Sequence, residues 1–125
     1  MDRIVGPAIE AYNPDIIIVA CGFDAAVIDP LSTMLATADT FRQMTLKIMA
    51  VADKVCNGKL VLNHEGGYSE VYVPFCGHAT LEALSGSSIT APDPFQHAFA
   101  CRQPGERLDA FLISEIDRMA NILEL

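Results

Sequence analysis

Two short segments of this chain hold side chains whose types and positions suit catalysis. Asp24 ends the segment Cys21-Gly22-Phe23-Asp24, and Tyr68 ends the segment Glu65-Gly66-Gly67-Tyr68. The carboxylate of an aspartate is ionised near neutral pH and suits a hard or borderline cation. A tyrosine hydroxyl can donate a hydrogen bond to negative charge that develops on an oxygen, and two preceding glycines let the backbone pass close to a bound group. These residue types indicate a cation ligand and an oxyanion donor.

The same residues also have ordinary structural interpretations. An aspartate after a strand is often a helix or loop cap, and a tyrosine at the start of a helix is more often a packing residue than a catalyst. Cys21 has no adjacent base and is interpreted as a small buried packing residue. The three histidines, His64, His78 and His97, are interpreted as locally hydrogen-bonded, packing or surface residues.

Two short apolar runs must position these segments. Residues 16–20 form a run of mostly β-branched residues without polar alternation, which is typical of a strand covered on both faces in a parallel sheet. Residues 59–63 contain a second buried strand. Because ligands collect at the carboxyl ends of parallel strands, we expect Asp24 and Tyr68 to reach the same edge of one sheet.

Helices and loops account for the remaining chain. The patterns predict helices over residues 3–12, 69–84 and 108–123, and a further helix that begins at a cap at Asp39 or Thr40 and ends at about Val55. They predict loops over residues 21–35 and 85–105. Asn57 and Gly58 predict a left-handed end for the second helix. No convincing third strand follows, and two parallel strands that are apolar on both faces need neighbours. The patterning therefore predicts part of a larger α/β domain.

Composition excludes several classes of protein. The chain has 125 residues, is 51% hydrophobic and carries a net charge of −8, so it is neither disordered nor suited to general binding of nucleic acid or anionic membranes. Its longest apolar stretch is far shorter than a membrane span, and no secretion signal is visible. Its four cysteines show no paired spacing, which favours reduced thiols and a cytoplasmic location.

In order and spacing, the segments 16–25, 29–31 and 64–68 resemble the histone deacetylase family, and more narrowly the bacterial histone deacetylase-like amidohydrolases. Those enzymes are related to the class II deacetylases and the acetylpolyamine amidohydrolases. The resemblance implies an α/β fold, namely the C-terminal part of an arginase/deacetylase-type three-layer fold with a parallel sheet. It implies that residues 1–86 are the C-terminal part of the catalytic domain, and that residues 87–125 add a loop and a helix to it.

The resemblance also implies a role for each matching residue. Asp24 matches a zinc-ligating aspartate, and Tyr68 matches the tyrosine that stabilises the oxyanion of the attacked amide. Gly66 and Gly67 match glycines that line the acyl-lysine tunnel, and Leu31 matches an apolar tunnel residue. The implied activity is zinc-dependent hydrolysis of N-acetyl amides, with acetyl-lysine or an acetylated polyamine as substrate.

The sequence departs from the family pattern in one important respect. The family also uses an Asp-x-His ligand segment and a histidine pair, and this sequence has neither. Because a catalytic zinc takes three protein ligands and an open position, we expect the chain alone neither to retain zinc nor to deacetylate. We expect it to act with a missing N-terminal part or a complementary chain, in a longer or split enzyme.

The sequence leaves a second function open and disfavours a third. A non-catalytic remnant can act as a protein-interaction module through its strand edges and the apolar side of its last helix. That helix packs on the body or on another subunit, so a homo-oligomer is possible. A nucleotide-binding domain is disfavoured, because no GxGxxG follows the first strand and no GxxxxGK[ST] occurs.

Overall fold

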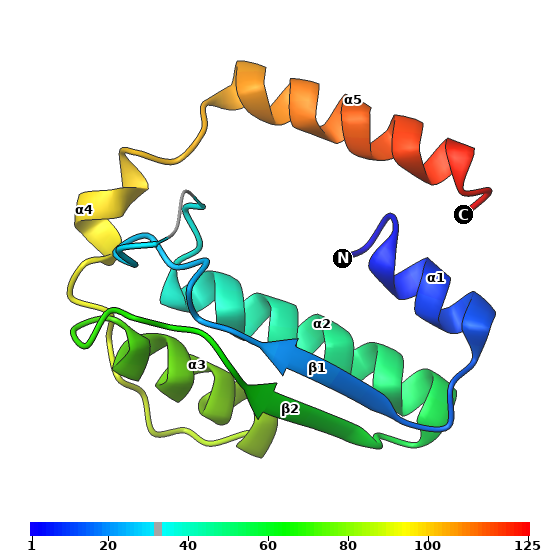
Figure 1. The fold of residues 1–125 in the computed structure, drawn as a ribbon, viewed down its shortest axis with the longest axis horizontal. Helices are drawn as coiled ribbons and strands as arrows, with labels where there is room; N and C mark the ends of the chain where they lie inside the picture. The colour runs from blue at the N-terminus through cyan, green and yellow to red at the C-terminus, as the bar shows by residue number, and fades with distance from the viewer. Residues whose placement is uncertain (32–33) are drawn as a thin grey trace.

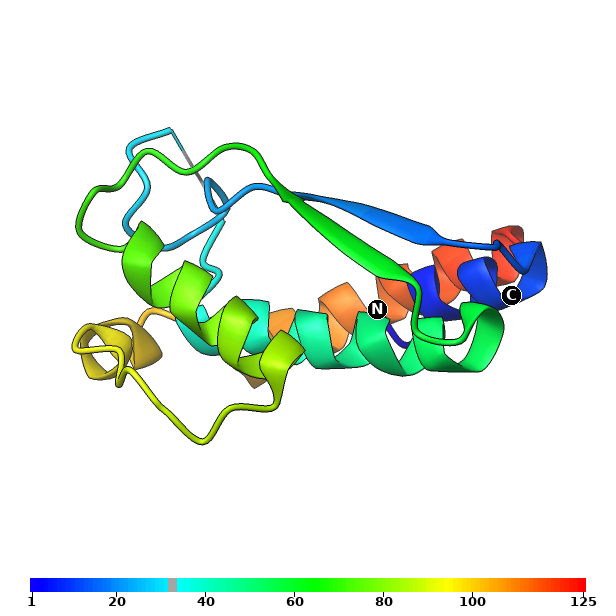
Figure 2. The ribbon, with the colours of Figure 1, turned by 90° about the horizontal axis from the view of Figure 1, so that it is seen from below.

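The computed structural model describes residues 1–31 and 34–125, in which a two-stranded parallel sheet lies on a layer of helices (Figure 1). The elements in chain order are α1 (Val5–Tyr12), β1 (Ile17–Cys21), α2 (Ala38–Cys56), β2 (Leu60–His64), α3 (Val73–Ser85), α4 (Gln96–Ala100) and α5 (Glu106–Ile122). Figure 2 shows α2 and α3 on the same side of the sheet. The mixed α/β architecture with a parallel sheet confirms the predicted fold class.

The sheet is covered by helices on one face. β1 and β2 pair in parallel from Ile17 with Leu60 to Cys21 with His64, and α2 forms the crossover between them. Ile17 packs with Ile48 of α2 in a buried cluster. On the opposite face Ile18 is 68% exposed and Val61 is 49% exposed. The described residues supply a helical layer for one face only, so the expected cover of the second face stays a prediction.

Helix α2 begins earlier than expected, because its cap is a different residue. Thr37 accepts a hydrogen bond from the backbone N–H of Thr40 at 3.3 Å, and the side chain of Thr40 accepts one from the N–H of Thr37 at 3.1 Å. This reciprocal pair corrects the prediction of a cap at Asp39 or Thr40. The other end agrees with the prediction, since Asn57 adopts the left-handed conformation with φ 53°.

Helix α3 begins at Val73, four residues later than expected. The backbone N–H groups of Tyr72 and Val73 both donate to the carbonyl of Ser69, so a turn precedes the helix. Pro74 lies in the first turn, where its missing N–H costs nothing. The segment 85–105, predicted as a loop, also contains the five-residue helix α4.

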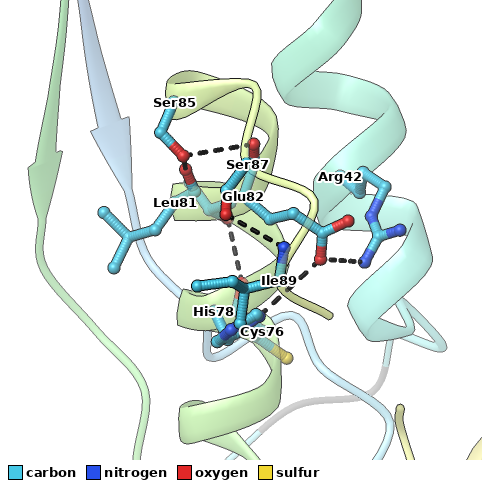
Figure 3. Close-up of polar contacts among 9 residues, drawn as sticks. Arg42, Cys76, His78, Leu81, Glu82, Ser85, Ser87 and Ile89 are labelled. Atoms are coloured by element: carbon cyan, nitrogen blue, oxygen red, sulfur yellow. Dashed lines mark hydrogen bonds and ion pairs between the residues drawn. The ribbon is translucent and has the colours of Figure 1, made fainter. Parts of the chain in front are cut away.

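A polar contact joins α2 to α3 beside an aromatic core. Arg42 donates to the Glu82 carboxylate at 2.9 Å, and Nδ1 of His78 lies 3.7 Å from the same carboxylate (Figure 3). The adjoining core contains Phe23, Phe41, Tyr72 and Cys76, with the three alanines Ala26, Ala38 and Ala79. This core lies beneath the loop that follows β1, and therefore supports the segment that carries Asp24.

Helix α5 contacts the body only lightly. An ion pair joins Asp117 to Arg3, and Ala120 is buried. All seven of its large apolar side chains are exposed, namely Leu108, Phe111, Leu112, Ile113, Ile116, Met119 and Ile122. Packing on the body therefore accounts for little of its apolar surface. No helix within the described residues is both long and apolar enough to cross a membrane.

Candidate functional site

The loops that follow β1 and β2 run side by side beyond the ends of the strands (Figure 1). The backbone N–H of Glu65 donates to the carbonyl of Cys21 at 3.2 Å, and the N–H of Phe23 donates to the carbonyl of Gly66 at 2.7 Å. These two bonds extend the pairing of the strands into the loops. The two predicted segments therefore meet at the carboxyl edge of the sheet, as the strand assignment required.

The Asp24 carboxylate lies between two glycines. A Cβ atom added to Gly22 would lie 2.7 Å from Oδ1 of Asp24, and one added to Gly66 would lie 2.3 Å from Oδ2. Either distance is too short for a real contact, so the carboxylate occupies space that exists only because both neighbours lack a side chain. The preceding Phe23 is buried and packs edge-on against Phe41, which anchors the segment in the core.

Gly67 immediately precedes Tyr68 in the loop that follows β2. Its φ is +139°, which side chains rarely allow, and an added Cβ would lie 3.0 Å from Cγ2 of Val73 and 3.1 Å from Cβ of Phe23. Both the backbone conformation and the space therefore require glycine at this position. Tyr68 follows with its side chain 56% exposed.

A buried carboxylate that sequence reasoning did not select connects the two loops. Asp29 accepts a hydrogen bond from the backbone N–H of Leu31 at 2.9 Å and another from the N–H of Tyr68 at 2.7 Å. The bond to Leu31 is a local turn of the kind that an Asp-Pro pair favours, so the sequence contained a signal for it. The bond to Tyr68 spans 39 positions, and no local pattern indicates it.

The residues predicted to line the substrate path differ in their exposure. Gly66, beside Asp24, and the following Gly67 are half-buried, whereas Leu31 is 71% exposed. The structure thus brings Asp24, Gly66, Gly67 and Tyr68 together in adjoining loops, and Asp29 connects Leu31 to them. These residues, the two glycines through their backbone, supply one wall of a site rather than an enclosed tunnel.

The metal-binding capacity of the described residues falls short of a zinc site. Within residues 1–31 and 34–125, no group of three or more His, Cys, Asp or Glu side chains is placed to hold a metal ion. Asp24 offers one carboxylate, whereas a catalytic zinc takes three protein ligands. The donor set of this chain therefore does not fit a zinc ion without further ligands.

Three other ionisable side chains near the site, those of His64, His78 and Cys21, lie against neighbouring side chains or are partly buried. The His64 ring lies 5.1 Å from the ring of Phe23, and His78 approaches Glu82 on α3. Burial raises the pKa of the Cys21 thiol, so this side chain stays protonated near neutral pH and is a poor nucleophile. Cys21 packs against the aromatic core but is only partly buried, and the local hydrogen bond expected for His64 stays a prediction.

Comparison with known protein families gives a match over most of the chain. Residues 1–84 match the histone deacetylase domain. A histone deacetylase-like amidohydrolase from Pseudomonas aeruginosa is 43% identical over 120 residues, which are 96% of this chain and 32% of that protein. A probable deacetylase from Archaeoglobus fulgidus is 32% identical over 92 residues, which are 73% of this chain and 26% of that protein.

Solved structures give the same result. The HDA15 HD domain superimposes with a TM-score of 0.60 at 30% identity, over 72% of this chain and 24% of that chain. The histone deacetylase Clr3 superimposes with a TM-score of 0.61 at 29% identity, over 78% of this chain and 17% of that chain. The present chain therefore spans about a third or less of the length of these similar proteins.

Proposed function

The chain belongs to the histone deacetylase family, and on this basis we propose that it supplies one part of the active site of a zinc-dependent amide hydrolase. The substrate class is N-acetyl amides of lysine or polyamine side chains. The observation that carries the proposal is the Asp24 carboxylate held against Gly66, in the loop that leads to Tyr68.

Each of the five residues has a definite role in this proposal. Asp24 is one zinc ligand, and Tyr68 donates its hydroxyl hydrogen to the oxyanion that forms from the amide carbonyl. Gly66, Gly67 and Leu31 line the path of the acyl group. Zinc, when bound, polarises the carbonyl and makes water a stronger nucleophile. The exposed position of Tyr68 supports the proposal, because an approaching substrate can reach its side chain.

The rest of the site comes from another segment, either an N-terminal part of the same protein or a complementary chain. Three observations support this: the single carboxylate ligand, the exposed outer face of the sheet at Ile18 and Val61, and the short span of the chain relative to similar proteins. In this proposal the chain alone is inactive, and residues 87–125 belong to the same domain. Four free thiols support a cytoplasmic location.

A hybrid enzyme tests the proposal directly. The 120-residue matching segment of the Pseudomonas aeruginosa amidohydrolase is replaced by this chain, so that the remaining two-thirds of that protein supplies the other ligands. The hybrid is expected to bind zinc and to hydrolyse an acetyl-lysine amide. Tyr68→Phe should lower kcat by about 10²- to 10³-fold, with little change in KM. Asp24→Ala should lower the zinc content.

The matched control is Tyr12→Phe, which removes a hydroxyl from an 82% exposed tyrosine on α1. It should leave kcat and zinc content unchanged. A folded, zinc-loaded hybrid that fails to hydrolyse acetyl amides would refute the proposed activity. A Tyr68→Phe hybrid as active as its parent would refute the role of the hydroxyl. Turnover by the isolated chain would refute its expected inactivity.

A second function, a non-catalytic protein-interaction module, is favoured by the exposed apolar side chains of α5 and the uncovered face of the sheet. A module of this kind should purify as a soluble, cooperatively unfolding protein without a partner. Its binding should be unaffected by Asp24→Ala and Tyr68→Phe, because neither side chain contributes to that apolar surface. Loss of binding in these two variants would exclude it.

A further inference from the structure

Asp29 is a buried carboxylate that connects the two loops of the candidate site. Asp29 precedes Pro30 and is 8% exposed, and each of its carboxylate oxygens accepts one backbone hydrogen bond. Oδ1 accepts from Leu31 in its own loop, and Oδ2 accepts from Tyr68 in the loop after β2. A single side chain thus joins two of the residues that the proposed function uses.

The loop that holds Asp29 is itself fixed by backbone hydrogen bonds. The N–H of Asp29 donates to the carbonyl of Ala26 at 3.0 Å. At the base of the loop, Val27 donates to Ala36 at 2.9 Å, and Ala36 donates to Ala25 at 3.2 Å. Asp29 therefore presents its carboxylate to Tyr68 from a stable support.

Tyr68, in contrast, has few contacts of its own. Its side chain is 56% exposed, and among the described residues no hydrogen bond involves its hydroxyl. The position of the hydroxyl therefore depends on the backbone from which the side chain leaves. The preceding Gly67 is conformationally permissive and restrains that backbone little, whereas the backbone N–H of Tyr68 itself is held by its 2.7 Å hydrogen bond to Asp29.

We propose that Asp29 is a positioning residue, whose carboxylate holds the backbone of Tyr68 and Leu31 in place beside Asp24. It does not touch the substrate, and its effect on the reaction passes through Tyr68. The catalytic part of this inference rests on the proposed function. The structural part does not, since it concerns two backbone amides of the chain.

Amide hydrogen exchange of the 125-residue chain, followed residue by residue by NMR, tests the structural part. Hydrogen bonds to a charged acceptor are the stronger kind, so Asp29→Ala should speed exchange at the Leu31 and Tyr68 amides by about 10- to 100-fold. Asp29→Asn keeps one acceptor oxygen and should have an intermediate effect. The control is Asp15→Asn, which removes the same charge from an exposed site.

Two further amides distinguish positioning from general support of the loops. Phe23 and Glu65 donate to backbone carbonyls across the same pair of loops and should keep their protection in the Asp29 variants. Equal acceleration at all four amides would overturn the inference, because Asp29 would then stabilise the loops as a whole. No acceleration at Tyr68, or a wild-type Tyr68 amide that exchanges as fast as in an unfolded chain, would also overturn it.

Kinetics of the hybrid enzyme test the catalytic part. Asp29→Asn should lower kcat by about 10-fold or more, since a displaced hydroxyl reaches the oxyanion poorly. In a hybrid that already carries Tyr68→Phe, the same substitution should have little further effect, because the group being positioned is gone. Fully independent effects of the two substitutions would overturn the inference. A wholly inactive hybrid would refute the proposed function and leave the exchange result intact.

Discussion

Replacing Gly66 with alanine should displace the Asp24 carboxylate while leaving the fold nearly as stable as before. The new Cβ would lie 2.3 Å from Oδ2 of Asp24 and 2.7 Å from Cγ. Real Cβ contacts essentially never fall below 3.0 Å, so the carboxylate must recede by about 0.7 Å to relieve the shorter contact. Gly66 does not have a positive φ, so alanine can adopt its backbone conformation.

The expected magnitudes differ for stability and for catalysis. The atoms that must move belong to the end of one side chain at a partly exposed position, so the free energy of unfolding should fall by only about 1 kcal/mol. A displacement approaching 1 Å at a catalytic group can lower the rate by about 100-fold. In the hybrid enzyme, Gly66→Ala should therefore reduce kcat/KM by about that factor and weaken the binding of zinc.

The assay pairs urea unfolding of the chain with zinc content and turnover of the hybrid. Gly105→Ala is the control for zinc content and turnover, because no atom lies within 4 Å of its added Cβ and its φ is −86°. Its urea unfolding is interpreted separately, because Gly105 is the N-cap of α5. When Asp24 is first changed to alanine, Gly66→Ala should have no further effect on stability or zinc binding. Full activity of the Gly66→Ala hybrid, or an equal loss in the absence of the Asp24 carboxylate, would refute the reasoning.

Three other predictions concern the core and the cap of α2, and urea or pH titrations check them. Tyr72→Phe should lower the free energy of unfolding by about 1–3 kcal/mol. The fully buried hydroxyl of Tyr72 accepts a hydrogen bond from the Ala38 N–H at 3.1 Å and donates one to Asp93, and both are lost. An unchanged urea midpoint would contradict this prediction. Thr37→Ala should lower the free energy of unfolding by about 1 kcal/mol because it removes the cap of α2, whereas Asp39→Ala should lower it clearly less. The reverse order of the two effects would contradict the observed cap. Burial and the nearby Asp93 carboxylate raise the pKa of the Cys76 thiol from 9.0 to about 12, so its contribution to stability is complete below pH 9 and is lost as the pH rises toward 12. Cys76→Ala should reduce this loss of stability at alkaline pH. Iodoacetamide at pH 8 should modify the exposed Cys101 but not Cys76 in the folded chain.

Local patterns in the sequence predicted both strands and the segments that carry chemistry, but they missed α4 and misplaced the starts of α2 and α3. The β-branched run before Cys21 predicted β1, and Asn57 predicted the end of α2, because each signal resides in a few adjacent residues. Asp24 and Tyr68 could be selected because they follow two parallel strands, whose carboxyl ends share one edge of a sheet. Their proposed roles come from the family resemblance together with this placement.

Contacts between distant parts of the chain decided the rest. The Thr37 cap of α2 is an exception, because its partner Thr40 is only three positions away and the pair is a local signal that sequence reasoning missed. The bond from Tyr68 to Asp29 and the fit of Asp24 against Gly66 join residues about 40 positions apart, so neither has a local signature. The sequence by itself therefore determined which residues are candidates, because residue type and strand position are local properties. Only the tertiary structure decided how they are held, because that depends on which oxygen of a buried carboxylate meets which backbone amide.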